Sequence, residues 1–280
     1  MTRIYSRPCP IQKLTNPPHH HFFGYYEKSP WDNDDRRILC GQVDFNDRMP
    51  TPDDVLRIGV IDTDESSEPT FVDETRAWCF QQGCMLQWMP PHYRDWIIFN
   101  DRDGNRFVSR LRNVRTGETK QFDVPVYQLD PAGRYALTTN FARLADTRPG
   151  YGYEGVDDPW AGDPSPRDDG LYHLDLDSGE CRLVFSLAAA AQIKPCESMQ
   201  DAKHWFNHIQ ISRDGTWFAL LHRWQASGMK THATRLIVGD PFNGQCRVRF
   251  DNTFFSHYDW LGSDTIVGYG SLPGTENDRQ

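Results

Sequence analysis

The sequence predicts an all-β protein: a β-propeller of four-stranded blades that occupies residues 1–280 as one domain and lacks part of its C-terminal blades. Three observations predict this fold. Helix-forming stretches are scarce, short aromatic and β-branched runs are broken by Gly, Pro, Asp and Asn, and one hairpin pattern recurs along the chain. Units of roughly 40–50 residues that hold two hairpins are typical of propeller blades.

The recurring hairpin begins with an apolar or aromatic anchor residue, which is followed by a polar turn and a second apolar run. The anchors are Trp31, Trp88, Leu129, Ile211 and Trp260, in segments such as SPWDNDDRRILCGQV and HIQISRDGTWFALLH. Successive anchors lie 57, 41, 82 and 49 residues apart. The interval of 82 is about twice one blade and contains the irregular stretch 146–170.

A second kind of hairpin lies between the anchors, with a turn such as TG, SG or NG between two strands. It is seen in FVSRLRNVRTGETKQF, GLYHLDLDSGECRLVF and TRLIVGDPFNGQCRVRF. The best helix signal is the Ala-rich stretch 186–193. The last unit supplies one hairpin and then the polar tail GTENDRQ, so either residues 1–20 add strands to the last blade or blades are missing. An unrelated β-sandwich is the alternative fold.

Composition narrows the classes of function. The net charge is −9 from 30 basic and 39 acidic residues, and no basic run stands out, which argues against a nucleic-acid partner. Seven irregularly spaced Cys without a CxxC pair are typical of reduced, mostly buried thiols. We see neither a signal peptide nor a membrane span and expect a cytoplasmic protein without a membrane partner. Walker A, GxGxxG, GxSxG and HExxH motifs are absent from the sequence.

Equivalent positions of different blades converge around a propeller's central channel, which predicts where a site lies. Three residues before the anchors stand Lys28, Met85, Val126, His208 and His257. His208 and His257 are therefore expected near each other at the channel mouth, as ligands of a divalent metal or as acid–base groups. Gln210 lies on the same strand face as His208. The structural alternative is that each His only caps its blade through hydrogen bonds.

Other polar residues near the predicted mouth are candidates for binding an acidic sugar, because Arg pairs with carboxylates and aromatic rings stack on sugar rings. His222 and Arg223 follow the inner hairpin and are the catalytic candidates, with His222 as a base. The substrate-binding candidates, for which solvated loop residues are the alternative, are Arg76, Gln82, Arg143, Arg148, Tyr151 and Gln210.

The segments HFFGYYEKSPWD, TRAWCFQQGCMLQW, RPGYGY, NHIQISRDGTWFALLHRW and SHYDW resemble those of oligogalacturonate lyases, and more closely those of uncharacterised bacterial relatives associated with polysaccharide gene clusters. The resemblance covers nearly the whole chain and implies a WD40/TolB-like propeller. It implies a divalent metal, typically manganese (Mn), with His208 at a ligand position and β-elimination next to a uronate carboxylate. The family's other ligands belong to a blade after residue 280, and a truncated parent gene is one explanation.

Two functions follow as expectations. The first is a carbohydrate-active, lyase-like propeller that acts on an acidic oligosaccharide or polysaccharide containing uronic acid. The alternative is a non-catalytic propeller that binds a glycan or a protein in polysaccharide metabolism. A WD-type protein scaffold is weaker, because regular Gly-His and Trp-Asp pairs are absent from the anchor segments.

Overall fold

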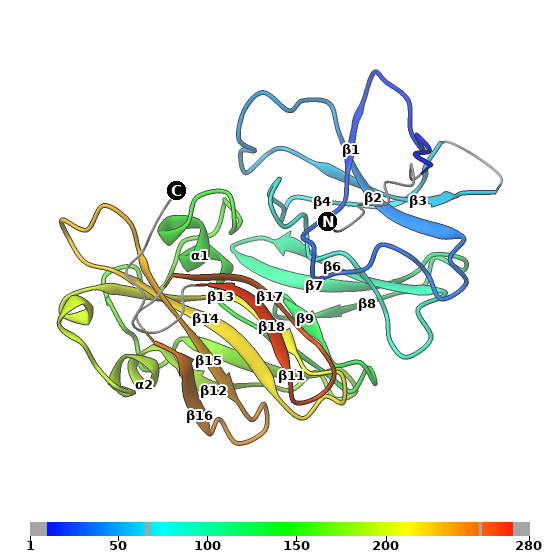
Figure 1. Cartoon of the computed structure of the whole chain (residues 1–280). Coiled ribbons are helices and arrows are strands. Elements are labelled where there is room, and N and C mark those ends of the chain that lie inside the picture. Colours follow the sequence, from blue (N-terminus) through cyan, green and yellow to red (C-terminus); the bar gives the residue numbers. More distant parts are fainter. Residues whose placement is uncertain (1–9, 65–67, 252–253, 271–280) are drawn as a thin grey trace, which may run out of the picture.

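The computed structural model describes residues 10–64, 68–251 and 254–270, and its strands form successive antiparallel sheets (Figure 1). The polar tail 274–280 and Cys9 lie outside the described residues. Four sheets have four strands each, and the pair β17–β18 forms a fifth, two-stranded sheet within the described range. The chain is therefore a β-propeller of four-stranded blades, as predicted.

The blades follow the order of the sequence. The first contains β1 (His20–Phe22), β2 (Arg37–Val43), β3 (Leu56–Asp62) and β4 (Thr70–Thr75). The second contains β5 (Gln87–Trp88), β6 (Trp96–Asp103), β7 (Arg106–Asn113) and β8 (Thr119–Phe122). The third contains β9 (Gln128–Leu129), β10 (Tyr135–Thr138), β11 (Gly170–Asp175) and β12 (Cys181–Ser186). The fourth contains β13 (Lys203–Ile211), β14 (Phe218–Gln225), β15 (Ala233–Gly239) and β16 (Cys246–Phe250), before β17 (Phe255–Trp260) and β18 (Ile266–Gly270).

The outer hairpins of three blades close with the same local chemistry. The side chains of Asn113, Asp175 and Asp240 each accept hydrogen bonds from two backbone N–H groups of the following turn. A glycine with positive φ then ends the turn and donates its N–H back to the carbonyl of the Asn or Asp, at 2.9–3.0 Å. These turns are Asx-turns, which are determined by local sequence, and they confirm the predicted repeat.

The inner hairpins are also closed by side chains that follow the anchors. Asp32, directly after Trp31, accepts from the backbone N–H groups of Arg36 and Arg37, and Asp130, directly after Leu129, accepts from that of Arg134. In the SRDG turn, the Ser212 hydroxyl accepts from two backbone N–H groups. These side chains thus stabilise the inner turns by accepting hydrogen bonds from their backbone N–H groups.

The hydrophobic core lies between neighbouring sheets rather than in one centre. One cluster joins the first two blades through residues such as Ile58, Trp88 and Phe99, and another joins the third and fourth through Leu137 and Ile209. Eight of the nine residues of β13 are buried. Both faces of each central sheet are therefore covered, which is the burial expected of stacked propeller blades.

The irregular stretch of the third blade is folded against the fourth blade by one arginine. Helix α1 (Phe141–Thr147) begins at Asn140, whose side chain caps it. From this helix, Arg143 donates to the carbonyls of Trp160, Asp163 and Pro164, to Asp158, and to the carbonyl of His204 on β13. This network fixes the stretch that carries Arg148 and Tyr151.

A segment of the first blade crosses the central channel. Phe22 pairs with Gly41 and Trp31 bridges Ile38, so eight residues on one side lie opposite two on the other. The excess chain bulges inward as residues 23–30, which we call the central segment. A Cβ at Gly24 would stand 2.8 Å from the carbonyl oxygen of Gln82, so the approach to the second blade needs glycine there.

The central segment touches the other blades in turn. Lys28 bonds Gln128 of the third blade, Tyr25 stacks on His208 of the fourth, and the Tyr26 hydroxyl accepts from the Tyr258 N–H of β17 at 3.0 Å. The described residues before Pro30 thus supply β1 to the first blade and side chains to the channel.

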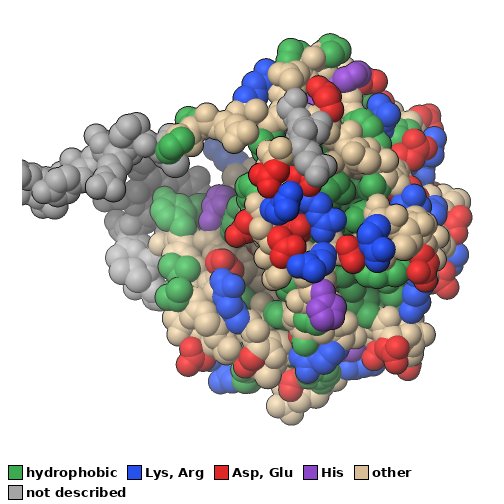
Figure 2. Space-filling model, turned by 90° about the vertical axis from the view of Figure 1, so that its right-hand side faces the viewer, with side chains coloured by type: hydrophobic (Ala, Val, Ile, Leu, Met, Phe, Trp, Pro, Cys, Tyr) green, Lys and Arg blue, Asp and Glu red, His purple; other side chains and the backbone are tan. Residues whose placement is uncertain are grey.

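The helical elements are short. The predicted Ala-rich helix is α2 (Leu187–Gln192), and a 3-10 turn, η1, spans Glu197–Met199. No helix in the described part of the chain has the length and apolar character needed to cross a membrane. On the face drawn in Figure 2, basic and acidic side chains alternate. All six described Cys are free, and three of them, Cys40, Cys79 and Cys84, are buried.

Candidate functional site

Three of the five positions that precede the anchors share an unusual backbone conformation. Met85, His208 and His257 have φ values of 54°, 52° and 24°, in the left-handed region that side chains other than glycine rarely adopt. At His208 and His257 the inner strand also shifts register against its neighbour. Strained bulges of this kind re-aim side chains at the ends of strands, and they support the equivalence of the two His positions.

His208 is 3% exposed and lies between aromatic rings. Tyr25 stacks on its imidazole with centroids 4.9 Å apart, and Tyr151 meets it edge-on at 5.8 Å. Its backbone N–H donates to the Tyr127 hydroxyl, and its carbonyl accepts from the Tyr258 hydroxyl. Its Nδ1 has no hydrogen-bond partner among the described residues. Burial lowers the pKa of His208 well below its usual value, and nearby Arg223 and Arg148 lower it further, so the ring is neutral at pH 7.

Arg223, on β14, is a buried cation of this region that lacks a salt-bridge partner among the described residues. The residue is 3% exposed, and neither Nε nor Nη1 has a hydrogen-bond partner within the described parts of the chain. Burial lowers its pKa to about 10, and the positive charge of Arg148 contributes, whereas the hydroxyls of Tyr151, Tyr127 and Tyr25 oppose the change. A guanidinium desolvated in this way favours an anionic partner.

Arg148 and His232 complete the cluster. Arg148 lies over the Tyr151 ring, 4.3 Å from its centroid, and its Nη1 lies 3.5 Å from His232 Nε2. The Nε of Arg148, like the Nε and Nη1 of Arg223, has no hydrogen-bond partner in the described ranges. Burial and the two arginines lower the pKa of His232 to about 4. We call Tyr25, Arg148, Tyr151, His208, Arg223 and His232 the arginine cluster.

The arginine cluster suits an anion and does not fit a divalent metal. Among the charged groups with the largest effect on His208 are Arg223, Arg148 and Lys28, and all three repel a cation. Three or more His, Cys, Asp or Glu side chains placed to hold a metal ion are not found among the described residues. The residues of the arginine cluster therefore do not fit the manganese that the resemblance implies.

His222 points away from this cluster, although it precedes Arg223 directly. Neighbouring residues of a strand face opposite sides of the sheet, so the two side chains diverge. Arg235 Nε donates to His222 Nδ1 at 2.9 Å, and His222 Nε2 lies 2.8 Å from His204 Nδ1. Because arginine only donates, Nδ1 of His222 is the acceptor, and the proton of Nε2 is directed at His204. Both nitrogens of His222 are thus occupied, and the geometry offers a substrate no free base there.

The remaining candidates divide between structural contacts and the channel. Arg143 is 1% exposed, and its guanidinium makes the structural hydrogen bonds described above. Gln82 donates to the Tyr127 hydroxyl at 2.6 Å. The Arg76 side chain is exposed. Gln210 donates to the Tyr258 carbonyl, and its Oε1 has no partner within the described residues.

His257 is exposed and contacts Tyr26 with tilted rings, whose centroids are 5.4 Å apart, next to the Tyr25–His208 stack. The two imidazoles are close enough for the charge of His257 to lower the pKa of His208. They differ in setting, because His208 is enclosed by Tyr25 and Tyr151 whereas His257 faces outward.

Sequence reasoning missed Tyr25, Tyr127 and His232. Tyr25 lies in HFFGYYEKSPWD, a segment named above only for its resemblance to lyase segments, and its position follows from the bulge of the central segment. Tyr127 directly follows Val126, one of the aligned positions, so the blade alignment could have identified it. His232 lies in the loop between β14 and β15, and we find no sequence signal for it.

No family model matches the sequence, and no curated protein matches it. Among solved structures, the chain is similar to the crystal structure of TolB from Acinetobacter baumannii, at 11% identity and a TM-score of 0.47, over 85% of this chain and 45% of that chain. It is similar to an oligogalacturonate lyase from Vibrio parahaemolyticus at 11% identity and a TM-score of 0.45, over 95% and 76% of the two chains. A prolyl endopeptidase matches at 10% identity and 0.48, over 90% and 32%. The chain thus spans less than half the length of the TolB chain, and the assignment of the propeller fold stands on the sheets described above.

Proposed function

We propose that the chain binds the carboxylate of a uronic acid residue in the arginine cluster and cleaves the acidic saccharide by β-elimination. The observation that carries this proposal is Arg223, a buried guanidinium near Arg148 whose Nε and Nη1 have no hydrogen-bond partner among the described residues. A carboxylate offers the planar, bidentate acceptor that a guanidinium prefers, and it would offset the repulsion between the two arginines. The rings of Tyr25 and Tyr151 supply faces against which a sugar ring packs.

The proposed chemistry follows from the same geometry. The arginines neutralise the carboxylate, which makes the adjacent C5 proton more acidic. His208 Nδ1 accepts that proton, the C4–C5 double bond forms, and the bond from C4 to the leaving oxygen breaks. The Tyr25 hydroxyl donates a proton to that oxygen; burial raises the pKa of Tyr25, so it holds its proton at neutral pH. A bound carboxylate also opposes the cations that lower the pKa of His208.

A non-catalytic glycan-binding propeller is the second candidate, and one observation favours it. The pKa of His208 lies well below its usual value, so the ring is a weak base until an anion binds. Binding without turnover is the outcome that this candidate predicts.

The experiment mixes the chain with oligogalacturonides, oligoalginates and glucuronate-containing oligosaccharides. Heat on titration reports binding, and ultraviolet absorbance reports the unsaturated product. We expect one class to bind and to give absorbance, with absorbance lost and binding kept in a His208→Asn variant. Binding without absorbance supports the second candidate, and the absence of binding across the panel refutes both.

A further inference from the structure

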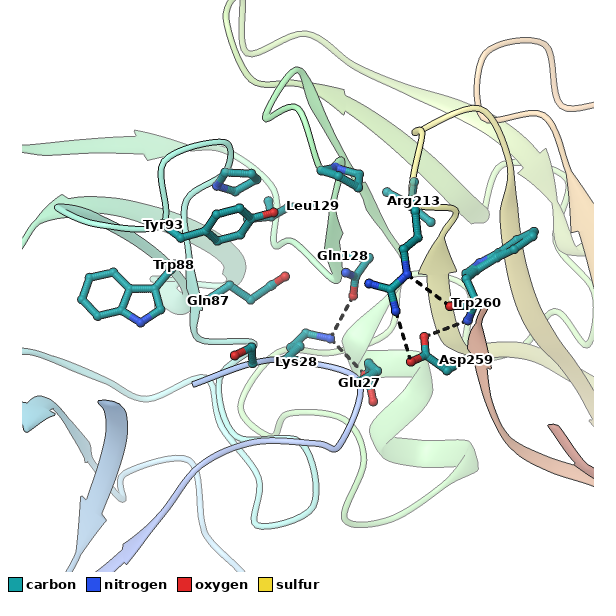
Figure 3. A pocket seen from close by; sticks show the side chains of 14 residues that line it. Glu27, Lys28, Gln87, Trp88, Tyr93, Gln128, Leu129, Arg213, Asp259 and Trp260 are labelled. Carbon is teal, nitrogen blue, oxygen red and sulfur yellow. Dashed lines mark hydrogen bonds and ion pairs between the residues drawn. The ribbon is translucent and has the colours of Figure 1, made fainter. Parts of the chain in front are cut away.

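A cavity opens where the inner strands end, next to the anchor residues. It has a volume of about 430 Å³, and four of the five anchors, Trp88, Leu129, Ile211 and Trp260, line it. Figure 3 shows Lys28 between Gln128 and Glu27 in its middle, with Tyr93 and Trp88 on one side and Arg213 and Trp260 on the other. We call this cavity the anchor pocket.

Lys28 and Tyr127 separate the anchor pocket from the arginine cluster. Lys28 Nζ lies 5.0 Å from the centroid of the Tyr127 ring, whereas the hydroxyl at the other end of that ring bonds Gln82 and the N–H of His208. Both residues are buried, Tyr127 completely. Buried Lys28 and Tyr127 thus lie between the anchor pocket and the arginine cluster, which argues against a single ligand that extends through both.

The polar groups of the anchor pocket have hydrogen-bonding capacity to spare. Lys28 Nζ donates to Glu27 Oε1 at 2.9 Å and to Gln128 Oε1 at 3.3 Å, which uses two of its three N–H groups. Glu27 Oε2 has no partner among the described residues, although the Glu27 side chain is 2% exposed. An unused acceptor and an unused donor thus stand side by side on a buried ion pair.

The pocket carries no net formal charge. Glu27 is paired with Lys28, and Asp259 lies 4.0 Å from Arg213, so its two acidic and two basic side chains cancel. This balance contrasts with the arginine cluster, where cations dominate. Uncharged hydroxyl groups suit such a site, because each can accept from Lys28 and donate to Glu27 without disturbing the ion pair.

The walls of the pocket combine apolar, aromatic and polar residues in similar measure. Tyr93, Pro90, Leu129, Trp88 and Trp260 line it, and Gln87 and Gln128 add amide groups. Small-molecule sites combine apolar surface with convergent polar groups, and pockets of about 300–1,000 Å³ enclose such ligands. A pyranose presents this combination, with C–H faces for the walls and neighbouring hydroxyls for the polar groups.

We infer that the anchor pocket binds a neutral saccharide unit, with its hydroxyls on Lys28, Glu27 and Gln128. The site is independent of the uronate site proposed above and goes beyond that function. It gives the channel one end for acidic sugar and one for neutral sugar.

The test uses the methyl glycosides of glucose, galactose, mannose and N-acetylglucosamine, and saturation-transfer NMR as the readout. We expect at least one to bind, and we expect Gln128→Ala to weaken that binding about three- to tenfold, as loss of one hydrogen bond does. Gln121→Ala, which changes an exposed glutamine of β8, is the matched control and leaves the binding unchanged.

Competition separates this site from the arginine cluster. We expect the neutral glycoside to remain bound when an oligogalacturonide is added. Two results overturn the inference: no glycoside binds at about 10 mM, where a ligand with a Kd near 1 mM would fill most sites, or binding is displaced by the oligogalacturonide and insensitive to Gln128→Ala. Neither result bears on uronate binding itself, so the two proposals fail separately.

Discussion

Replacing Arg223 by methionine is expected to make the protein more stable. The pKa of Arg223 falls from its ordinary value to about 10, mainly through burial. At about 1.4 kcal/mol per pKa unit, this difference corresponds to about 3 kcal/mol against the charged form. Methionine fills a similar volume without that penalty, so we expect the free energy of unfolding of Arg223→Met to rise by about 1–3 kcal/mol.

Arg143 provides the matched control, because it is an equally buried arginine with a different set of partners. Its guanidinium makes five hydrogen bonds to oxygen acceptors. Methionine at this position leaves those acceptors unpaired, so Arg143→Met is expected to lower the free energy of unfolding by at least about 3 kcal/mol. The same substitution thus has opposite signs at two buried arginines.

Urea unfolding followed by tryptophan fluorescence measures both variants at pH 7. The midpoint is expected to rise for Arg223→Met and to fall for Arg143→Met, with unchanged slopes. A drop of 1 kcal/mol or more for Arg223→Met would mean that its guanidinium is satisfied within the protein. Arg223 would then not be an unpaired group that is available to a ligand.

Three further predictions concern stability. The folded-state pKa values of His204 and His232 are lowered to about 4, so the unfolded chain binds more protons than the folded chain below pH 6.5. We therefore expect the urea midpoint to be constant above pH 6.5 and to fall as the pH drops towards 4. A midpoint that does not change with pH would contradict this. A Cβ at Gly244, where φ is +71°, would lie 2.2 Å from the Val184 carbonyl oxygen, whereas a Cβ at Gly104, where φ is +60°, would meet no atom within 4 Å. The left-handed backbone alone makes Gly104→Ala cost about 1 kcal/mol of stability. Gly244→Ala adds a steric clash, so it should lower Tm clearly more than Gly104→Ala. His222→Phe removes the acceptor of buried Arg235 and should cost at least about 2 kcal/mol in urea unfolding; a neutral result would show that the His204–His222–Arg235 chain adds no stability.

The blade repeat was predictable because its determinants are local. Asn113, Asp175 and Asp240, each with a glycine four residues later, close their turns through contacts inside a few residues. The alignment of anchors also placed His208 and His257 at equivalent positions, and their shared positive φ agrees with it.

The central segment was not predictable in the same way. Its path depends on contacts between residues far apart in the sequence, such as Tyr25 with His208 and Tyr26 with Tyr258. The separation of His222 from Arg223, in contrast, follows from the period-two alternation of a strand and was available in the sequence.

The uronate affinity of Arg223→Met, compared with that of the unaltered chain, tests the central claim most directly. Trigalacturonate is titrated calorimetrically into both proteins at one salt concentration, since screening weakens charged contacts. Loss of a charge-assisted contact is expected to weaken binding by about 10- to 100-fold, while the variant unfolds at a higher urea concentration. Equal Kd values for the two proteins would contradict the claim that the arginine cluster binds a carboxylate.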